Sequence, residues 1–205
     1  MKLLRITQIS LVVACLLSLV AIAGTLLSNF ITSSSYVTPP QTTGRALIGG
    51  PFTLTDHSGA RVSEQTFAGQ FTLIFFGYTY CPDVCPTELQ TMTDALGLLG
   101  QKAERVTPIF VTVDPERDTV EQMASYVANF HSRLVGLTGT EQDIRDMAKT
   151  FRIYYAKAEN YDPGTDYLMS HSSIVYLMGP TNEFLTHFSH GTNAREMADG
   201  IEKHL

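Results

Sequence analysis

Cysteine is scarce in this chain: only Cys15, Cys81 and Cys85 occur among its 205 residues. Cys15 lies within a long apolar run, where a small polarisable side chain needs no special role. The other two cannot form the framework of several disulfides that stabilises small secreted domains. The fold must therefore depend on its hydrophobic core, which leaves Cys81 and Cys85 available for chemistry.

Positive charge is scarce as well. Removing Lys2 and Arg5 from the 14 basic residues leaves 12 against 20 acidic residues, a formal charge of −8 for the rest of the chain. Such a surface suits solubility and cationic partners, and it argues against nucleic acid as a partner. The chain has no internal repeat that would indicate an array of small units.

Charge is absent altogether from residues 6–31, an apolar run of about 26 residues that follows Lys2 and Arg5. About 20 helical residues cross a bilayer, so residues 1–31 are predicted to form a transmembrane helix. The next basic residue is Arg45, which places the N-terminus in the cytoplasm. We therefore expect a single-pass protein of the inner (plasma) membrane, with its C-terminal domain on the periplasmic side.

A cleaved signal peptide is the alternative interpretation of this segment, because Ala21 and Ala23 before Gly24 resemble a cleavage site. The apolar run continues past that point, which favours a retained anchor, and either interpretation exports the domain. Residues 32–46 are rich in Ser, Thr, Pro and Gly and are expected to be a linker. Residues 47–205 are expected to form the folded domain.

Two apolar segments, residues 71–76 and 107–113, are predicted to be buried strands, the first at the centre of a sheet. Between them, apolar residues recur every three or four positions from about Pro86 to Gly100, which predicts a helix. Strand, helix and strand at this spacing indicate a βαβ unit with parallel strands.

The remaining patterns complete the prediction. They indicate a hairpin over residues 52–62, a helix capped by Asp118 or Thr119, a strand over 134–137, a helix from Thr140, an extended segment over 153–158, a polar excursion over 159–166, antiparallel strands over 173–178 and 183–188, and a final helix over 194–201. A βαβ unit followed by a terminal ββα unit predicts an α/β, thioredoxin-like fold, a mixed central sheet flanked by helices.

Cys81 and Cys85 lie four residues apart where a strand is followed by a helix, so both side chains share one face of that helix. They are close enough to share a metal ion or to form a disulfide. The helix N-terminus favours the thiolate that either role needs. Three residues separate the two cysteines, whereas redox Cys-x-x-Cys motifs have two, so the spacing leaves both roles open.

A two-thiolate metal site would be sparse, so a third ligand is expected from elsewhere in the chain. Of six histidines, His171 is the candidate, because it follows the polar excursion and precedes a buried strand, where a loop would place it over the cysteines. Asp83, between the cysteines, either tunes the charge of the site or is an ordinary exposed loop residue.

Four ordered motifs resemble the Sco/SenC family of membrane-anchored copper proteins that assist cytochrome c oxidase assembly. They are FFGYTYCPDVCPTEL, VDPERDT, LVGLTGT and HSSIVYLMGP, and the resemblance covers roughly residues 47–205. It implies that Cys81, Cys85 and His171 bind copper. Thiolates select Cu(I), and an added imidazole also suits Cu(II).

The resemblance also implies a function and partners. We expect a metallochaperone that is not an enzyme and that assists assembly of the binuclear copper centre. Its partners would be the copper-bearing subunit of the oxidase, which receives the copper, and another periplasmic copper carrier, which supplies it. The alternatives are a thiol-disulfide reductase with Cys81 and Cys85 as redox pair, which would keep the oxidase cysteines reduced, and a copper or redox sensor. Asp114 and Asp118 then belong to a loop beside the metal, although Asp118 also suits a simple helix cap.

Overall fold

The computed structural model describes residues 47–158 and 167–205. None of the helices within these residues is long and apolar enough to span a membrane. The predicted anchor (1–31), linker (32–46) and polar excursion (159–166) lie outside the described residues.

A seven-stranded mixed sheet forms the middle of the domain, in the order β2-β1-β5-β4-β3-β8-β9. Its strands are β1 (Thr53–Asp56), β2 (Arg61–Ser63), β3 (Phe71–Gly77), β4 (Val106–Thr112), β5 (Val135–Thr138), β8 (Ile174–Met178) and β9 (Phe184–Ser189). β3, β4 and β5 run parallel, and β8 joins β3 antiparallel. The predicted βαβ unit and the terminal antiparallel pair are confirmed.

β3 is buried along its whole length, because it lies between β4 and β8 and is covered on both faces. This burial is why its sequence is almost continuously apolar. β4 occupies the middle of the sheet, so the prediction that β3 is central is wrong by one position.

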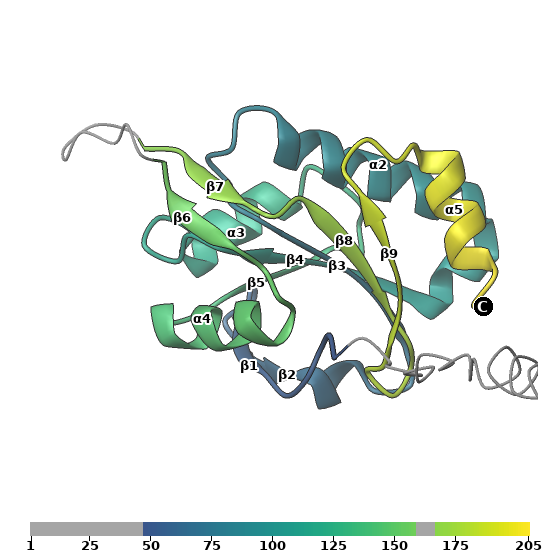
Figure 1. Cartoon of the computed structure of the whole chain (residues 1–205), viewed down its shortest axis with the longest axis horizontal. Coiled ribbons are helices and arrows are strands. Elements are labelled where there is room, and N and C mark those ends of the chain that lie inside the picture. The colour runs from purple at the N-terminus through teal and green to yellow at the C-terminus, as the bar shows by residue number, and fades with distance from the viewer. Residues whose placement is uncertain (1–46, 159–166) are drawn as a thin grey trace, which may run out of the picture. The chain divides into compact units, whose positions relative to one another are not determined.

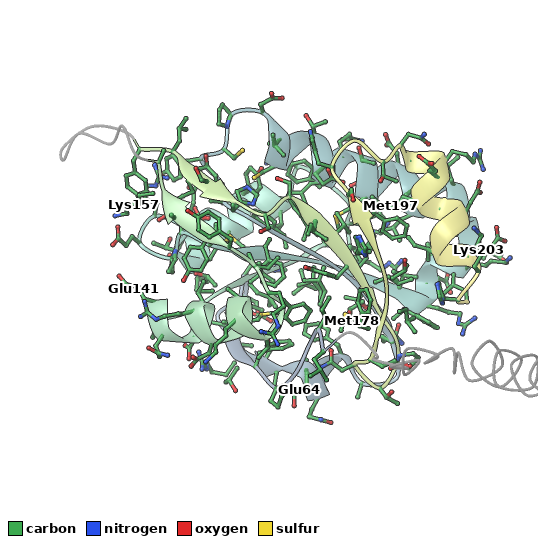
Figure 2. The ribbon with its side chains drawn as sticks, in the orientation of Figure 1. Glu64, Glu141, Lys157, Met178, Met197 and Lys203 are labelled. Atoms are coloured by element: carbon green, nitrogen blue, oxygen red, sulfur yellow. The ribbon has the colours of Figure 1, made fainter. Side chains whose placement is uncertain are left out.

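Within the described residues, four α-helices cover the sheet: α2 (Val84–Leu99), α3 (Val120–Val127), α4 (Glu141–Thr150) and α5 (Ala194–Glu202). Short 3-10 turns, η1 (Glu64–Phe67) and η2 (Gly100–Arg105), follow β2 and α2. Figure 1 shows α2 and α5 together on one side of the sheet and α4 on the other. Figure 2 shows Glu141 and Lys203 at the periphery, whereas Met178 and Met197 lie inside and are 0% exposed. These features confirm the thioredoxin-like arrangement.

A second, two-stranded sheet pairs β6 (Tyr155–Lys157) with β7 (Met169–His171). The sequence predicted β6 as an extended segment but did not predict β7. His171 therefore lies on a strand, opposite Tyr155, and not on the loop expected from the sequence. The error is understandable, because three residues are too few to show a strand periodicity.

Candidate metal centre

The two cysteines lie at the N-terminus of α2, on the loop that follows β3. Cys81 precedes the helix and is partly exposed, whereas Cys85 is its second residue and is fully buried. The N-cap residue Asp83 makes no side-chain hydrogen bond to the helix, and the Cys85 amide instead donates to Cys81 Sγ at 3.4 Å. The Cys81 sulfur therefore serves as acceptor at a helix end that favours negative charge.

Gly77, the last residue of β3, creates the space for Cys85. A Cβ atom at position 77 would lie 2.8 Å from Cys85 Sγ and 2.8 Å from a ring carbon of Phe110. Side chains do not approach one another so closely, and both neighbours are fully buried. Nothing in the sequence points to Gly77, because only the structure shows what packs against it.

His171 reaches the cysteines from β7. Its Nε2 atom lies 3.5 Å from Cys85 Sγ, and its Nδ1 atom lies 3.2 Å from the carbonyl oxygen of Ser172. A carbonyl can only accept, so Nδ1 carries the proton in that hydrogen bond, while Nε2 faces the cysteines. The rings of Phe75 and Tyr78 pack edge-on against the imidazole. The predicted trio of Cys81, Cys85 and His171 thus converges.

The two thiols titrate as a pair. The Cys85 thiol donates to the Cys81 sulfur, which lowers the pKa of Cys81 and raises that of Cys85. Burial of Cys85 raises its pKa further, while the His171 ring and the backbone amides at the helix start lower the pKa of Cys81. Cys81 therefore loses its proton more readily than Cys85.

The lowered pKa of Cys81 predicts an unusual pH dependence of its alkylation. Because its thiolate persists below the pKa of about 8.5 of a free cysteine, iodoacetamide should modify Cys81 at a rate that stays high down to at least about pH 6. Peptide mass spectrometry of the reduced protein separates Cys81 from Cys15 and Cys85. A rate that falls with a midpoint near pH 8.5 would contradict this description of the pair.

The three aspartates occupy different environments. Asp83 is exposed at the helix start. Asp118 is fully buried and is not the helix cap, since Thr119 caps α3. Its carboxylate accepts from the amide of Thr79 at 3.0 Å and from the Thr79 hydroxyl at 2.6 Å. Asp118 thus holds the loop that leads to Cys81.

Asp114 is also buried, and it belongs to a cluster that the sequence analysis did not identify. Its Oδ2 lies 2.5 Å from Arg117 Nε, and its Oδ1 accepts from the Tyr167 hydroxyl at 2.7 Å. Arg117 was visible only as part of the VDPERDT motif, and nothing in the sequence linked that motif to Tyr167. The cluster connects the loop after β4 to the chain that leads into β7.

An open hollow of about 440 Å³ gives access to the site. Its lining includes Tyr78, Cys81, Pro82, Asp83, Met169 and His171. Cys85 lies beneath this opening, buried against β3. A ligand from a partner can therefore reach Cys81 and His171 directly.

The donor set fits a soft metal ion. In the described part of the chain, no three His, Cys, Asp or Glu side chains are already arranged to hold a metal. Nevertheless, with the bond lengths of a tetrahedral zinc site, about 2.3 Å to a thiolate and about 2.0 Å to an imidazole, the two donor atoms would be about 3.5 Å apart. The observed Cys85 Sγ to His171 Nε2 distance is 3.5 Å. Two of the three donors thus stand at the spacing that a shared metal requires, and the Cys81 thiolate interacts with both.

The chain resembles known proteins over most of its length. A model of the SCO1/SenC family matches residues 40–205. The chain is 42% identical over 164 residues to the mitochondrial SCO1 homolog of Mus musculus, a match that covers 79% of this chain and 57% of that protein. This chain thus spans little more than half the length of that relative.

Solved structures of Sco proteins are also similar to this chain. The copper-bound structure of Bradyrhizobium japonicum ScoI is similar with a TM-score of 0.70 and 40% identity, covering 77% of this chain and 99% of that one. The structure of BsSco, described as a cytochrome c oxidase assembly protein with a disulfide switch, is similar with a TM-score of 0.59 and 28% identity, covering 78% and 93%.

Proposed function

Because the chain belongs to the SCO1/SenC family, we propose that it binds copper through Cys81, Cys85 and His171 and delivers it to the binuclear copper centre of cytochrome c oxidase. One observation carries this proposal: Cys85 and His171, 86 residues apart in the sequence, lie 3.5 Å from each other. Copper bound to ScoI of the same fold supports the choice of metal.

The chemistry of the donors suits a carrier. Two thiolates favour Cu(I), and the imidazole makes the site acceptable to Cu(II). Three protein ligands leave a coordination position for a ligand of the recipient, which enters through the hollow beside Cys81 and His171 before the donor ligands leave. The cargo metal is thus held by few ligands at an accessible surface, as transfer requires.

The proposed location follows from the N-terminal segment. Residues 1–31 would anchor the chain in the inner membrane, and residues 32–46 would tether the domain on the periplasmic side. There the domain meets the copper-bearing subunit of the oxidase and a periplasmic copper carrier that supplies the metal.

A thiol-disulfide reductase is the second candidate function, favoured by the two free thiols and by the lowered pKa of Cys81. The Cys81 thiolate would attack a disulfide of the oxidase subunit, forming a mixed disulfide and releasing one thiolate of the subunit. Cys85 would then attack the Cys81 sulfur, releasing the second thiolate of the subunit and leaving a Cys81–Cys85 disulfide. The disulfide switch named for BsSco makes this candidate worth testing. It needs no metal and no histidine.

Replacing His171 separates the two functions, since it removes a metal ligand and keeps both thiols. We expect His171→Ala to lower Cu(II) affinity by more than the roughly 10- to 100-fold loss seen for outer partners of metal ligands, and to abolish oxidase assembly with it. His187→Ala, which removes an exposed histidine of β9, is the matched control and should leave both unchanged. A His171→Ala protein that loses copper yet still assembles the oxidase would favour the reductase.

A further inference from the structure

The position of His171 depends on how the β6–β7 sheet is held. Among the described residues, β6 and β7 pair only with each other and form no ladder with the seven-stranded sheet. Figure 1 shows this small sheet at the opposite end of the domain from α5. Two hollows, of about 440 Å³ and about 230 Å³, border it, and Met169 of β7 lines both. Among the described residues, packing around the sheet is therefore incomplete, so its polar contacts gain importance.

Arg117 makes the most buried of these contacts. Its Nε is paired with Asp114 at 2.5 Å, and its Nη1 donates to the backbone carbonyl of Tyr167 at 2.9 Å. The Tyr167 hydroxyl donates back to Asp114, so the three residues form a closed set of hydrogen bonds. The side chains of Arg117 and Asp114 are only 16% and 2% exposed. A planar guanidinium fork in such a position fixes the distance and the angle between two loops.

The same guanidinium also contacts the loop that carries the cysteines. Its central carbon lies 3.6 Å from the ring centroid of Tyr167, 4.7 Å from that of Tyr80 and 5.8 Å from that of Tyr78. Tyr80 directly precedes Cys81, and the Tyr78 ring packs edge-on against the His171 imidazole at 5.9 Å. One side chain thus touches both segments that supply the candidate ligands.

A second ion pair near the β6–β7 sheet is weaker. Lys157 of β6 pairs with Glu116 at 2.8 Å, but their side chains are 39% and 51% exposed. Exposed pairs contribute little, because water and salt screen them. Arg117 is therefore the residue whose removal should most affect where the imidazole lies.

We propose that Arg117 is a positioning residue for His171: it ties the start of β7 to the loop after β4 and to the cysteine loop, and so presents the imidazole to the metal. This inference rests on the proposed copper site. It assigns Arg117 no contact with copper, so its removal should leave the two thiolates able to bind Cu(I). The imidazole contribution, which matters most for Cu(II), should be lost in part.

The test compares Cu(I) and Cu(II) binding by the full-length chain. Arg117→Ala should weaken Cu(II) binding about 10- to 100-fold and change its electron-spin and optical spectra, as loss of an outer partner does elsewhere. Cu(I) affinity should change by less than about threefold, because thiolates dominate it. In a His171→Ala background, Arg117→Ala should have no further effect on Cu(II). Arg133→Ala removes an arginine that likewise binds backbone carbonyls of another segment, and it should change neither affinity nor spectrum.

Arg117→Lys keeps the charge but not the fork, and it should show the same changes to a smaller degree. If Arg117→Ala does not fold, the same measurements are made on Arg117→Lys instead. If Cu(II) spectra and affinity were unchanged in both Arg117 variants, this inference would be wrong while the proposed function would stand. The same conclusion would follow if Arg117→Ala weakened Cu(II) binding equally in the His171→Ala background, or if Arg133→Ala weakened it as much as Arg117→Ala. Failure of the wild-type chain to bind copper would instead overturn the proposed function, and this inference with it.

Discussion

Asp118→Ala is expected to lower the free energy of unfolding by about 3 kcal/mol, measured by chemical denaturation. The Asp118 side chain is fully buried and accepts three hydrogen bonds, from the amide and hydroxyl of Thr79 and from the hydroxyl of Thr112. Alanine would leave these buried donors without an acceptor, and each unsatisfied group costs about 1 to 3 kcal/mol. Thr79 lies two residues before Cys81, so the same substitution should loosen the cysteine loop.

Two further variants make this expectation specific. Asp118→Asn keeps the shape and one acceptor oxygen, so its loss should be smaller than that of alanine. Asp83→Ala removes an exposed aspartate that makes no capping hydrogen bond, and the change should stay within about 0.5 kcal/mol. If Asp118→Ala destabilised the protein no more than Asp83→Ala, the buried network would not hold the loop as described.

Gly77→Ala should both destabilise the domain and weaken copper binding. The added methyl group would overlap Cys85 Sγ and the Phe110 ring, each 2.8 Å away. β3 cannot move aside easily, because it is hydrogen-bonded to β4 and β8 on its two edges. Overpacking of this kind costs about 1 to 3 kcal/mol, and relief by movement of Cys85 would displace a candidate ligand. Thermal unfolding and a Cu(I) competition titration measure the two effects.

Gly97→Ala is the matched control, since Gly97 lies on the exposed side of α2 with no atom within 4 Å of the added Cβ. Alanine there should raise stability by up to about 1 kcal/mol and leave copper binding unchanged. Equal behaviour of the two variants would show that Cys85 does not depend on the space beside Gly77.

Local sequence patterns were sufficient to predict most of the helices and strands of the fold. The apolar run of β3 and the three-to-four spacing in α2 predicted both elements, because burial on both faces leaves a continuous apolar run and burial on one face of a helix leaves a periodic one. β7 was missed, because a strand of three residues outside the main sheet has no such periodicity. The position of β4 at the middle of the sheet follows from pairing between distant strands, which a local pattern does not encode.

The candidate site, like the fold, was predictable from the sequence only in part. Cys81 and Cys85 were found from their spacing at a strand-to-helix junction. His171 was one histidine among six, and it was selected by its place before a buried strand and by resemblance to a family. The contacts of Arg117 with Tyr167, 50 residues away, and of Gly77 with Cys85 were not predictable, because they depend on the packing of separate elements.

The central claim is that one copper ion is held by Cys81, Cys85 and His171, and copper X-ray absorption spectroscopy of the loaded, full-length chain tests it most directly. The account predicts two sulfur neighbours and one nitrogen neighbour, with the nitrogen lost in His171→Ala and both sulfurs lost in the Cys81→Ser/Cys85→Ser double variant. A copper shell of only nitrogen and oxygen atoms, or a spectrum unchanged in these variants, would contradict it.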